Sequence, residues 1–110
     1  MKRFICTEMW DKAWYRKISP TQKLFWTYLF SKCDCAGVWE PDFELASFAL
    51  GATVSESDMS VFGDRVKKLT CGKWRLTTFV SVQYGEALNE KSSVHRGVMK
   101  LLRKHGVSLT

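Results

Sequence analysis

The fold of this chain is decided by residues 19–32, which read SPTQKLFWTYLFSK. Ser19 is a preferred N-cap, Pro20 suits the first helical position, and Gln22 can return the hydrogen bond of a capping box. These signals predict a helix from Ser19 to about Lys32. Its apolar side chains occupy most of the circumference, which is typical of a central helix packed on more than one side; a dimer contact over part of this surface is the alternative. They are Leu24, Phe25, Trp26, Tyr28, Leu29 and Phe30.

Shorter elements are predicted next to this helix. Upstream, Asp11 is expected to cap a short helix that contains Trp14. Downstream, the Ala-Gly pair at 36–37 makes a turn into a short strand over 38–40. Pro41 then stops the strand, because proline cannot donate to the hydrogen-bond ladder.

Residues 42–63 predict two short helices with a tight, glycine-containing junction. Asp42 caps the first, over 43–50, and Gly51 fits the position just past its end. Ser55 begins the second. The apolar positions at helical spacing are Leu45, Phe48 and Ala49 in the first helix, and Met59 and Phe62, pointing inward, in the second. Such a pair is a candidate helix-turn-helix.

From Arg65 the spacing changes from helical to alternating. A turn at 70–73 lies between two short apolar runs, which predicts a β-hairpin, and the apolar residues of 79–84 predict an extended segment after it. A last helix follows, capped by Ser92 or Ser93 and ended by Gly106. Its apolar stripe is Val94, Val98, Leu101 and Leu102, and Arg96, Lys100 and Arg103 lie on the opposite face.

The charges are divided between an acidic middle and basic flanks. Between Cys33 and Asp64 the chain has seven carboxylates and no lysine or arginine. Residues 1–32 carry seven lysines or arginines against two carboxylates, and residues 65–105 carry ten against two. The formal net charge of +6 therefore hides opposed segments, and a basic protein of this kind need not bind DNA with its middle.

Length and composition favour one packed domain. With 110 residues, of which 45% are hydrophobic and 14% aromatic, the chain has enough apolar surface for a core, which argues against disorder. The longest apolar stretch, 24–30, is far below the ~20 residues that span a bilayer, and residues 4–6 are too few for the apolar region of a signal peptide. We therefore expect a cytoplasmic protein that does not contact a membrane.

Neither a cofactor nor a metal is predicted. The cysteines are Cys6, Cys33, Cys35 and Cys71. Zinc sites usually repeat a pair of cysteines with two to four residues between them, whereas Cys33 and Cys35 are separated by one residue and have no second pair, so we expect buried, reduced thiols. The chain also lacks a glycine-rich phosphate loop and a nucleophile with an evident base. We therefore predict no enzyme, no catalytic residues and no small-molecule substrate.

Short motifs along nearly the whole chain add a resemblance to a known family. They are Trp10 with Trp14-Tyr15; Lys23-Leu24 through Tyr28-Leu29; Cys33-Asp34 with Ala36-Gly37-Val38-Trp39-Glu40; Phe62-Gly63-Asp64-Arg65-Val66; and Lys73-Trp74 through Phe79 to Gln83-Tyr84-Gly85, with Leu88-Asn89 and Val94-His95. In this order they resemble the N-terminal domain of phage replication initiator and replisome-organiser proteins, which is similar to that of the bacterial primosome protein DnaD.

The resemblance and the order of the predicted elements imply an α+β fold of the winged helix-turn-helix type. Residues 1–110 are expected to form one domain, with an N-terminal arm (1–18), a winged-helix core (19–84) and an extra C-terminal helix (85–110). The resemblance also implies a role in DNA replication initiation in the cytoplasm of a bacterium or a phage-infected cell. DNA and replication proteins such as a helicase loader are the implied partners, and a homo-oligomer is a further possibility.

Within such a fold, the hairpin and the last helix are the candidate DNA-binding elements. The second helix of such a motif commonly enters the major groove, but here it carries Glu56 and Asp58 and no cation. The hairpin has five cations within eleven residues and no carboxylate among them. We predict phosphate contacts from Arg65, Lys67, Lys68, Lys73, Arg75, Arg96, Lys100 and Arg103. The alternative is that these basic faces of the hairpin and the last helix are only solvated, and that the lysines of an edge strand discourage aggregation between sheets.

The acidic middle supports a different function, which is protein–protein interaction or oligomerisation in a phage primosome without DNA reading. Its carboxylates would meet a basic partner surface or the basic flanks of a second copy. The candidate partner-binding residues are Glu40, Glu44, Glu56 and Asp58.

The tryptophans are expected to serve the core first. Trp74 is predicted to pack in the core or against the last helix, with stacking on an unpaired base beside Lys73 and Arg75 as the alternative. The other four, Trp10, Trp14, Trp26 and Trp39, are predicted to be buried.

Overall fold

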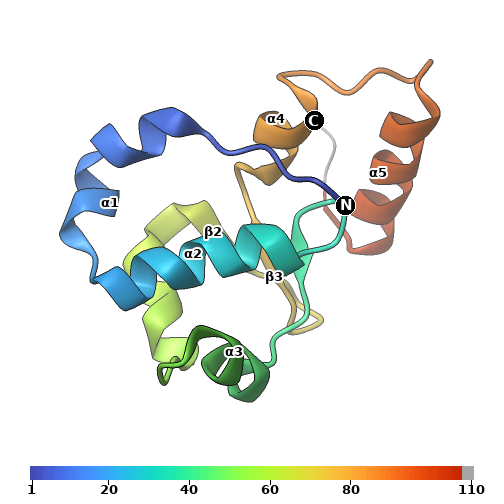
Figure 1. The fold of residues 1–110 in the computed structure, drawn as a ribbon. Helices are drawn as coiled ribbons and strands as arrows, with labels where there is room; N and C mark the ends of the chain where they lie inside the picture. Colours follow the sequence, from blue (N-terminus) through green and yellow to red (C-terminus); the bar gives the residue numbers. More distant parts are fainter. Residues whose placement is uncertain (108–110) are drawn as a thin grey trace.

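The central helix, α2, comprises Pro20–Lys32 in the computed structural model, which describes residues 1–107 (Figure 1). Its capping box is confirmed: the Gln22 backbone N–H donates to the Ser19 hydroxyl oxygen at 3.1 Å, and the Ser19 N–H donates to the Gln22 side-chain carbonyl at 3.0 Å. These two bonds satisfy backbone donors that the first turn of a helix leaves free. The start of α2 is therefore fixed locally.

Two sides of α2 are packed against aromatic rings. The Trp26 ring meets Trp14, with the ring centroids 5.2 Å apart. From another side of the helix, Phe25 meets Trp39 at 6.1 Å and Phe43 at 6.3 Å. The prediction of a central helix packed on more than one side is confirmed, and this aromatic cluster is the main core.

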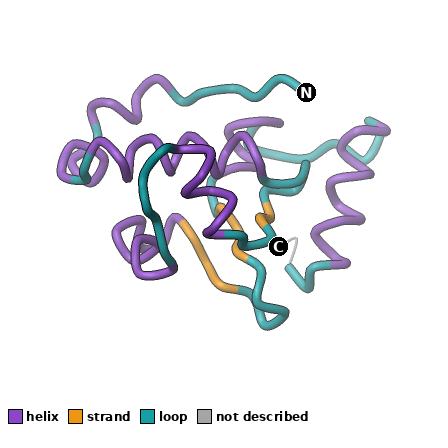
Figure 2. The backbone as a smooth tube through the Cα atoms, turned by 60° about the horizontal axis from the view of Figure 1, so that its bottom comes forward, coloured by secondary structure: helices purple, strands orange, loops and turns teal. Residues whose placement is uncertain are grey.

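The remaining elements surround α2 (Figures 1 and 2). Before it come a 3-10 helix, η1 (Thr7–Asp11), and α1 (Ala13–Lys17); after it come β1 (Val38–Trp39), α3 (Phe43–Leu50), the 3-10 helix η2 (Glu56–Arg65), β2 (Val66–Lys68), β3 (Trp74–Leu76), α4 (Phe79–Tyr84) and α5 (Ser93–Lys104). The strands form one antiparallel sheet in the order β1-β3-β2. The chain is thus a mixed α and β protein, as predicted. Among residues 1–107, no helix is long and apolar enough to cross a membrane.

The register of the sheet separates its two faces. Val66 pairs with Leu76, and Lys68 pairs with Trp74, whose β1 neighbour is Trp39. These residues lie on the face that packs toward α2, which we call the core face. The intervening row points to the other face, which we call the distal face.

A smaller apolar cluster holds α5 to the rest of the molecule. Val98 and Leu102 of α5 are buried with Ala36, which lies in the turn before β1. The same turn is fixed by Asp34, whose carboxylate accepts N–H bonds from Ala36 at 2.8 Å and Val38 at 3.1 Å. The other oxygen of Asp34 lies 2.8 Å from the ring Nε2 of His105, just after α5. One carboxylate therefore links the turn to α5.

Several predicted caps and turns are confirmed. Asp42 accepts from the Leu45 N–H at 2.9 Å, and Gly51 ends α3 with φ of 71°. Ser92 rather than Ser93 caps α5, accepting from the His95 N–H at 3.3 Å. The remaining confirmed positions are the hairpin turn at 70–73, the inward Met59 and Phe62, and Gly106, which has φ of 75° just past α5. The last residues of the predicted C-terminal segment, 108–110, lie outside the described part of the chain.

Four local predictions are wrong. Residues 79–84 form α4 instead of an extended segment, because their apolar spacing also fits a helix face. Asp11 ends η1 instead of capping α1. The second helix of the predicted pair is 3-10, with a non-helical Gly63 inside it. Leu45 and Phe48 of α3 are exposed, because the small Ala46 occupies the buried position.

The turn before β1 depends on a glycine that no other residue can replace. Gly37 has φ of 83°, and a Cβ atom there would lie 2.7 Å from the Cβ of buried Phe79. Gly72 has a similar φ of 89° with open space around it.

We expect Gly72→Ala to lower the free energy of unfolding by about 1–2 kcal/mol, the cost of a left-handed residue, and Gly37→Ala to lower it by about 3 kcal/mol or more. Urea denaturation measures both. Equal losses would contradict the proposed close approach of Gly37 to Phe79.

Candidate nucleic-acid interface

The distal face of the sheet carries two of the predicted DNA-binding cations. Val38, Arg75 and Lys67 stand opposite one another across β1, β3 and β2. Lys67 is exposed and Arg75 is half-buried. Within residues 1–107, neither cation has a carboxylate at ion-pair distance, and the buried Nε atom of Arg75 has no hydrogen-bond partner. Two like charges therefore face each other directly without neutralisation.

Two other predicted hairpin cations point elsewhere. Lys68 lies on the core face, where its ammonium is 2.7 Å from Glu56 of η2. The guanidinium of Arg65 stacks on the Trp14 ring at 4.2 Å and donates to the Phe62 carbonyl at 3.4 Å. Both side chains bridge elements of this domain, so the hairpin splits into separate groups of cations.

The cations of α5 form a second exposed group. Arg96, Lys100 and Arg103 lie on the side of the helix opposite to Val98 and Leu102, and all three are exposed. This is the basic face that the sequence predicts. Arg96 also donates to the Glu90 carbonyl at 3.0 Å.

The hairpin and α5 are neighbours in space. Leu69, which directly follows β2, packs against the cluster that contains Val98 and Leu102 of α5. Lys73 lies across the hairpin from Leu69, and the Leu69 N–H donates a hydrogen bond to the Lys73 carbonyl. The fold therefore brings Lys67, Lys73 and Arg75 next to the helix that carries the second basic group.

The four predicted partner-binding carboxylates have different surroundings. Glu40 and Glu44 are exposed, and Glu56 is paired with Lys68. Asp58 is occupied inside the domain, because one oxygen accepts from the Ser55 N–H at 2.8 Å and the other from the Gln22 side chain at 3.3 Å. The acidic surface available to a partner therefore centres on Glu40 and Glu44.

The tryptophans are buried with one exception. Trp26 and Trp39 are in the core, and Trp14 and Trp74 are partly buried against it. The ammonium of Lys68 lies 5.8 Å from the centre of the Trp74 ring. Trp10 is 61% exposed, so the prediction of its burial is wrong. Its ring meets buried Tyr15 in a T-shaped arrangement, with the ring centroids 5.3 Å apart.

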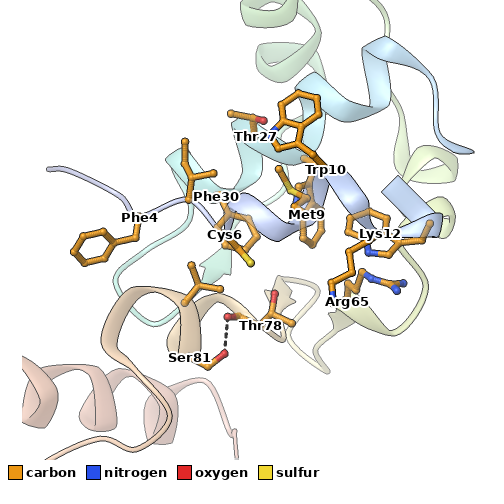
Figure 3. A pocket seen from close by; sticks show the side chains of 14 residues that line it. Phe4, Cys6, Met9, Trp10, Lys12, Thr27, Phe30, Arg65, Thr78 and Ser81 are labelled. Carbon is orange, nitrogen blue, oxygen red and sulfur yellow. Dashed lines mark hydrogen bonds between the residues drawn. The ribbon is translucent and has the colours of Figure 1, made fainter. Parts of the chain in front are cut away.

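A pocket under the N-terminal arm was not predicted. It has a volume of about 550 Å³ and lies between residues 4–14, α2 and α4 (Figure 3). Its walls are mainly apolar, and Lys12 and Arg65 lie together at one end. The sequence signal for it is the group of large apolar residues in the arm, of which only Trp10 and Trp14 are assigned a position, in the core.

The thiols and acidic groups provide no evident metal centre. In the part of the chain that the structure describes, no group of three or more His, Cys, Asp or Glu side chains is arranged to hold an ion. Cys33 is buried, and burial raises the pKa of its thiol to about 12, against a lowering by the Arg3 charge. Cys6 and Cys71 are exposed, so the prediction of buried thiols is wrong for these two residues.

No known family model matches this chain, and neither a curated protein nor a solved structure was found to be similar to it.

The cysteine environments predict an order of reactivity. At pH 8 the raised pKa leaves almost no Cys33 thiolate, which is the reactive form. We expect an alkylating reagent to modify Cys6 and Cys71 within minutes and Cys33 only after addition of denaturant, as followed by peptide mass spectrometry. Modification of Cys33 in the folded protein as fast as that of Cys71 would contradict the burial described for α2 and its C-terminus.

Proposed function

We propose that this chain is a winged-helix, DNA-associated module of a phage-type replication initiation protein that acts in the cytoplasm of a bacterium or an infected cell. In this function the β2–β3 hairpin is the wing, and together with α5 it contacts DNA phosphates. One observation carries the proposal: Lys67 and Arg75 face each other across the hairpin, with no carboxylate of residues 1–107 near enough to pair with them.

Such a pair is costly without a polyanion. Like charges directly opposite in an antiparallel pair are destabilising, and Arg75 also has a buried Nε atom that lacks an acceptor. Phosphate oxygens supply the opposite charge, and they release counterions when a cation binds them. The hairpin packs against the apolar side of α5, and the exposed cations on the opposite side of that helix add further phosphate contacts.

The order of the elements supports the winged-helix assignment. A helix, a short strand, two further helices and a hairpin follow one another, and the first strand joins the sheet beside the last strand of the hairpin. The chain departs from groove-reading members of this class at η2. That segment is 3-10 and begins with Glu56, so we propose phosphate contact by the wing in place of base reading by a recognition helix.

A second function, docking of a protein partner through α3, is favoured by a separate observation. Phe48 is 86% exposed and Leu45 is 54% exposed, and Glu44 lies one turn before Phe48 on the same helix. Large apolar side chains grouped on one helix face and flanked by charge are typical of interaction surfaces. Replication proteins such as a helicase loader, or a further copy of this chain, are the candidate partners.

The DNA-binding function is tested by removing the opposed cations. We expect Lys67→Ala/Arg75→Ala to weaken binding to both duplex and single-stranded DNA and to reduce the slope of log K against log salt by about 2. Fluorescence anisotropy across a salt series measures both quantities.

A matched control removes one arginine and one lysine from another exposed site. Arg16 and Lys17 end α1, away from α5 in Figure 1, so Arg16→Ala/Lys17→Ala should leave the salt slope within about 0.5 of the wild-type value. Equal losses in the two double variants, or no binding of the wild type at low salt, would contradict the proposed interface.

A further inference from the structure

Hydrogen bonds attach the N-terminal arm to the two helices that line the pocket. Gln83 of α4 accepts a hydrogen bond from the Phe4 N–H at 2.9 Å and donates to the Lys2 carbonyl at 3.3 Å. Arg3 donates to the Cys33 carbonyl at 2.9 Å, at the end of α2. These bonds tie the arm to two elements on either side of the pocket, so the cavity is a built feature of the fold.

The pocket is apolar with a positive end. Met9, Phe30 and Val82 contribute to its wall, and Trp10 lies at its rim (Figure 3). Two cations, Lys12 and Arg65, line one end, and no carboxylate is found among the described residues that line it. Such a pocket suits an apolar group that carries a negative charge beside it.

The exposed face of α3 has the complementary character. Phe48 projects almost fully into solvent, with Leu45 one turn before it as a second exposed apolar residue. Glu44 lies four residues before Phe48, hence beside it on the helix surface. The whole segment from Cys33 to Asp64 has no lysine or arginine, so the face presents an aromatic group in acidic surroundings.

We propose that α3 of one molecule docks into the arm pocket of a second copy, with Phe48 between Trp10 and Phe30 and Glu44 toward Lys12 and Arg65. This inference rests on the second proposed function, interaction through α3, and is independent of DNA binding. A cavity of about 550 Å³ is within the range of pockets that enclose a whole small ligand, so it has room for the Phe48 ring and part of Leu45. Apolar burial and charge complementarity act together in this contact.

The contact joins different surfaces of the two copies. Trp26, Thr27 and Phe30 of α2 line the pocket, whereas Phe25 faces α3. At 3.6 residues per turn the three pocket-lining positions lie roughly 100° to 160° around the helix from Phe25, and Figure 1 places the arm and α3 on opposite sides of α2. The association is therefore head-to-tail, and a bound pair leaves one free α3 and one free pocket, to which further copies can add.

The head-to-tail geometry gives a decisive mixing experiment. We expect wild-type protein to show a weight-average mass in light scattering that rises continuously with concentration. Phe48→Ala, which lacks the inserted ring, and Trp10→Ala, which lacks the rim, should each remain monomeric. A mixture of the two should form a 1:1 complex and nothing larger, because only one intact α3 and one intact pocket can meet.

Charge reversal provides a second, independent experiment. Glu44→Lys and Lys12→Glu should each abolish association, and mixing these two variants should restore chains in which the two variants alternate, because every junction then joins opposite charges at positions 12 and 44. All four substituted residues are exposed, and thermal unfolding checks that each variant is folded. DNA anisotropy of Phe48→Ala should match the wild type, which separates this proposal from the DNA-binding function.

Three results would overturn the inference. A wild type that stays monomeric at every concentration excludes a second copy as the occupant and leaves α3 for a foreign partner. Association that persists in both Phe48→Ala and Trp10→Ala places the contact elsewhere. Folded variants that are monomeric alone but form no complex when mixed exclude the pairing of α3 with the pocket.

Discussion

The packing of α2 on two sides is the constraint on which the rest of the structure depends. Trp26 and Phe25 point in different directions from one helix and are both buried, so α2 needs aromatic partners on both sides. The arm and η2 supply partners on one side, and β1 and α3 supply them on the other. Burial of such large rings contributes several kcal/mol. The same core contains Val66, the first residue of β2, and Leu76, the last residue of β3, so it holds both ends of the hairpin in place.

The division of charge follows from this packing. One face of the small sheet is committed to the core, so only alternate hairpin residues reach the distal face, and two of them are the opposed Lys67 and Arg75. The cluster around Leu69 and Leu102 then places α5 beside the hairpin. The carboxylates of the middle segment are left on α3 and η2, where Glu56 neutralises Lys68. Positive and negative surfaces thus belong to different elements, as the two separate contacts that we propose for this domain require.

The sequence predicts what is locally encoded. The capping box of Ser19, the Asp42 cap with Gly51, and the hairpin turn each depend on residues within a few positions of one another, and all are confirmed. Properties set by tertiary packing were not predictable. The spacing of 79–84 satisfies both a strand and a helix, and only contact with the core decides between them. The exposure of Phe48, the capture of Arg65 by Trp14, and the arm pocket likewise depend on segments distant in sequence.

The most direct test of the account is a residue-resolved map of the surface that meets DNA. In amide ¹H–¹⁵N NMR spectra of the labelled protein titrated with a short DNA, the account predicts shifts at the hairpin, over 67–75, and along α5, with little change in α3. Shifts confined to α3 and η2, with the hairpin and α5 unaffected, would contradict the assignment of the cationic hairpin as the DNA-contacting element.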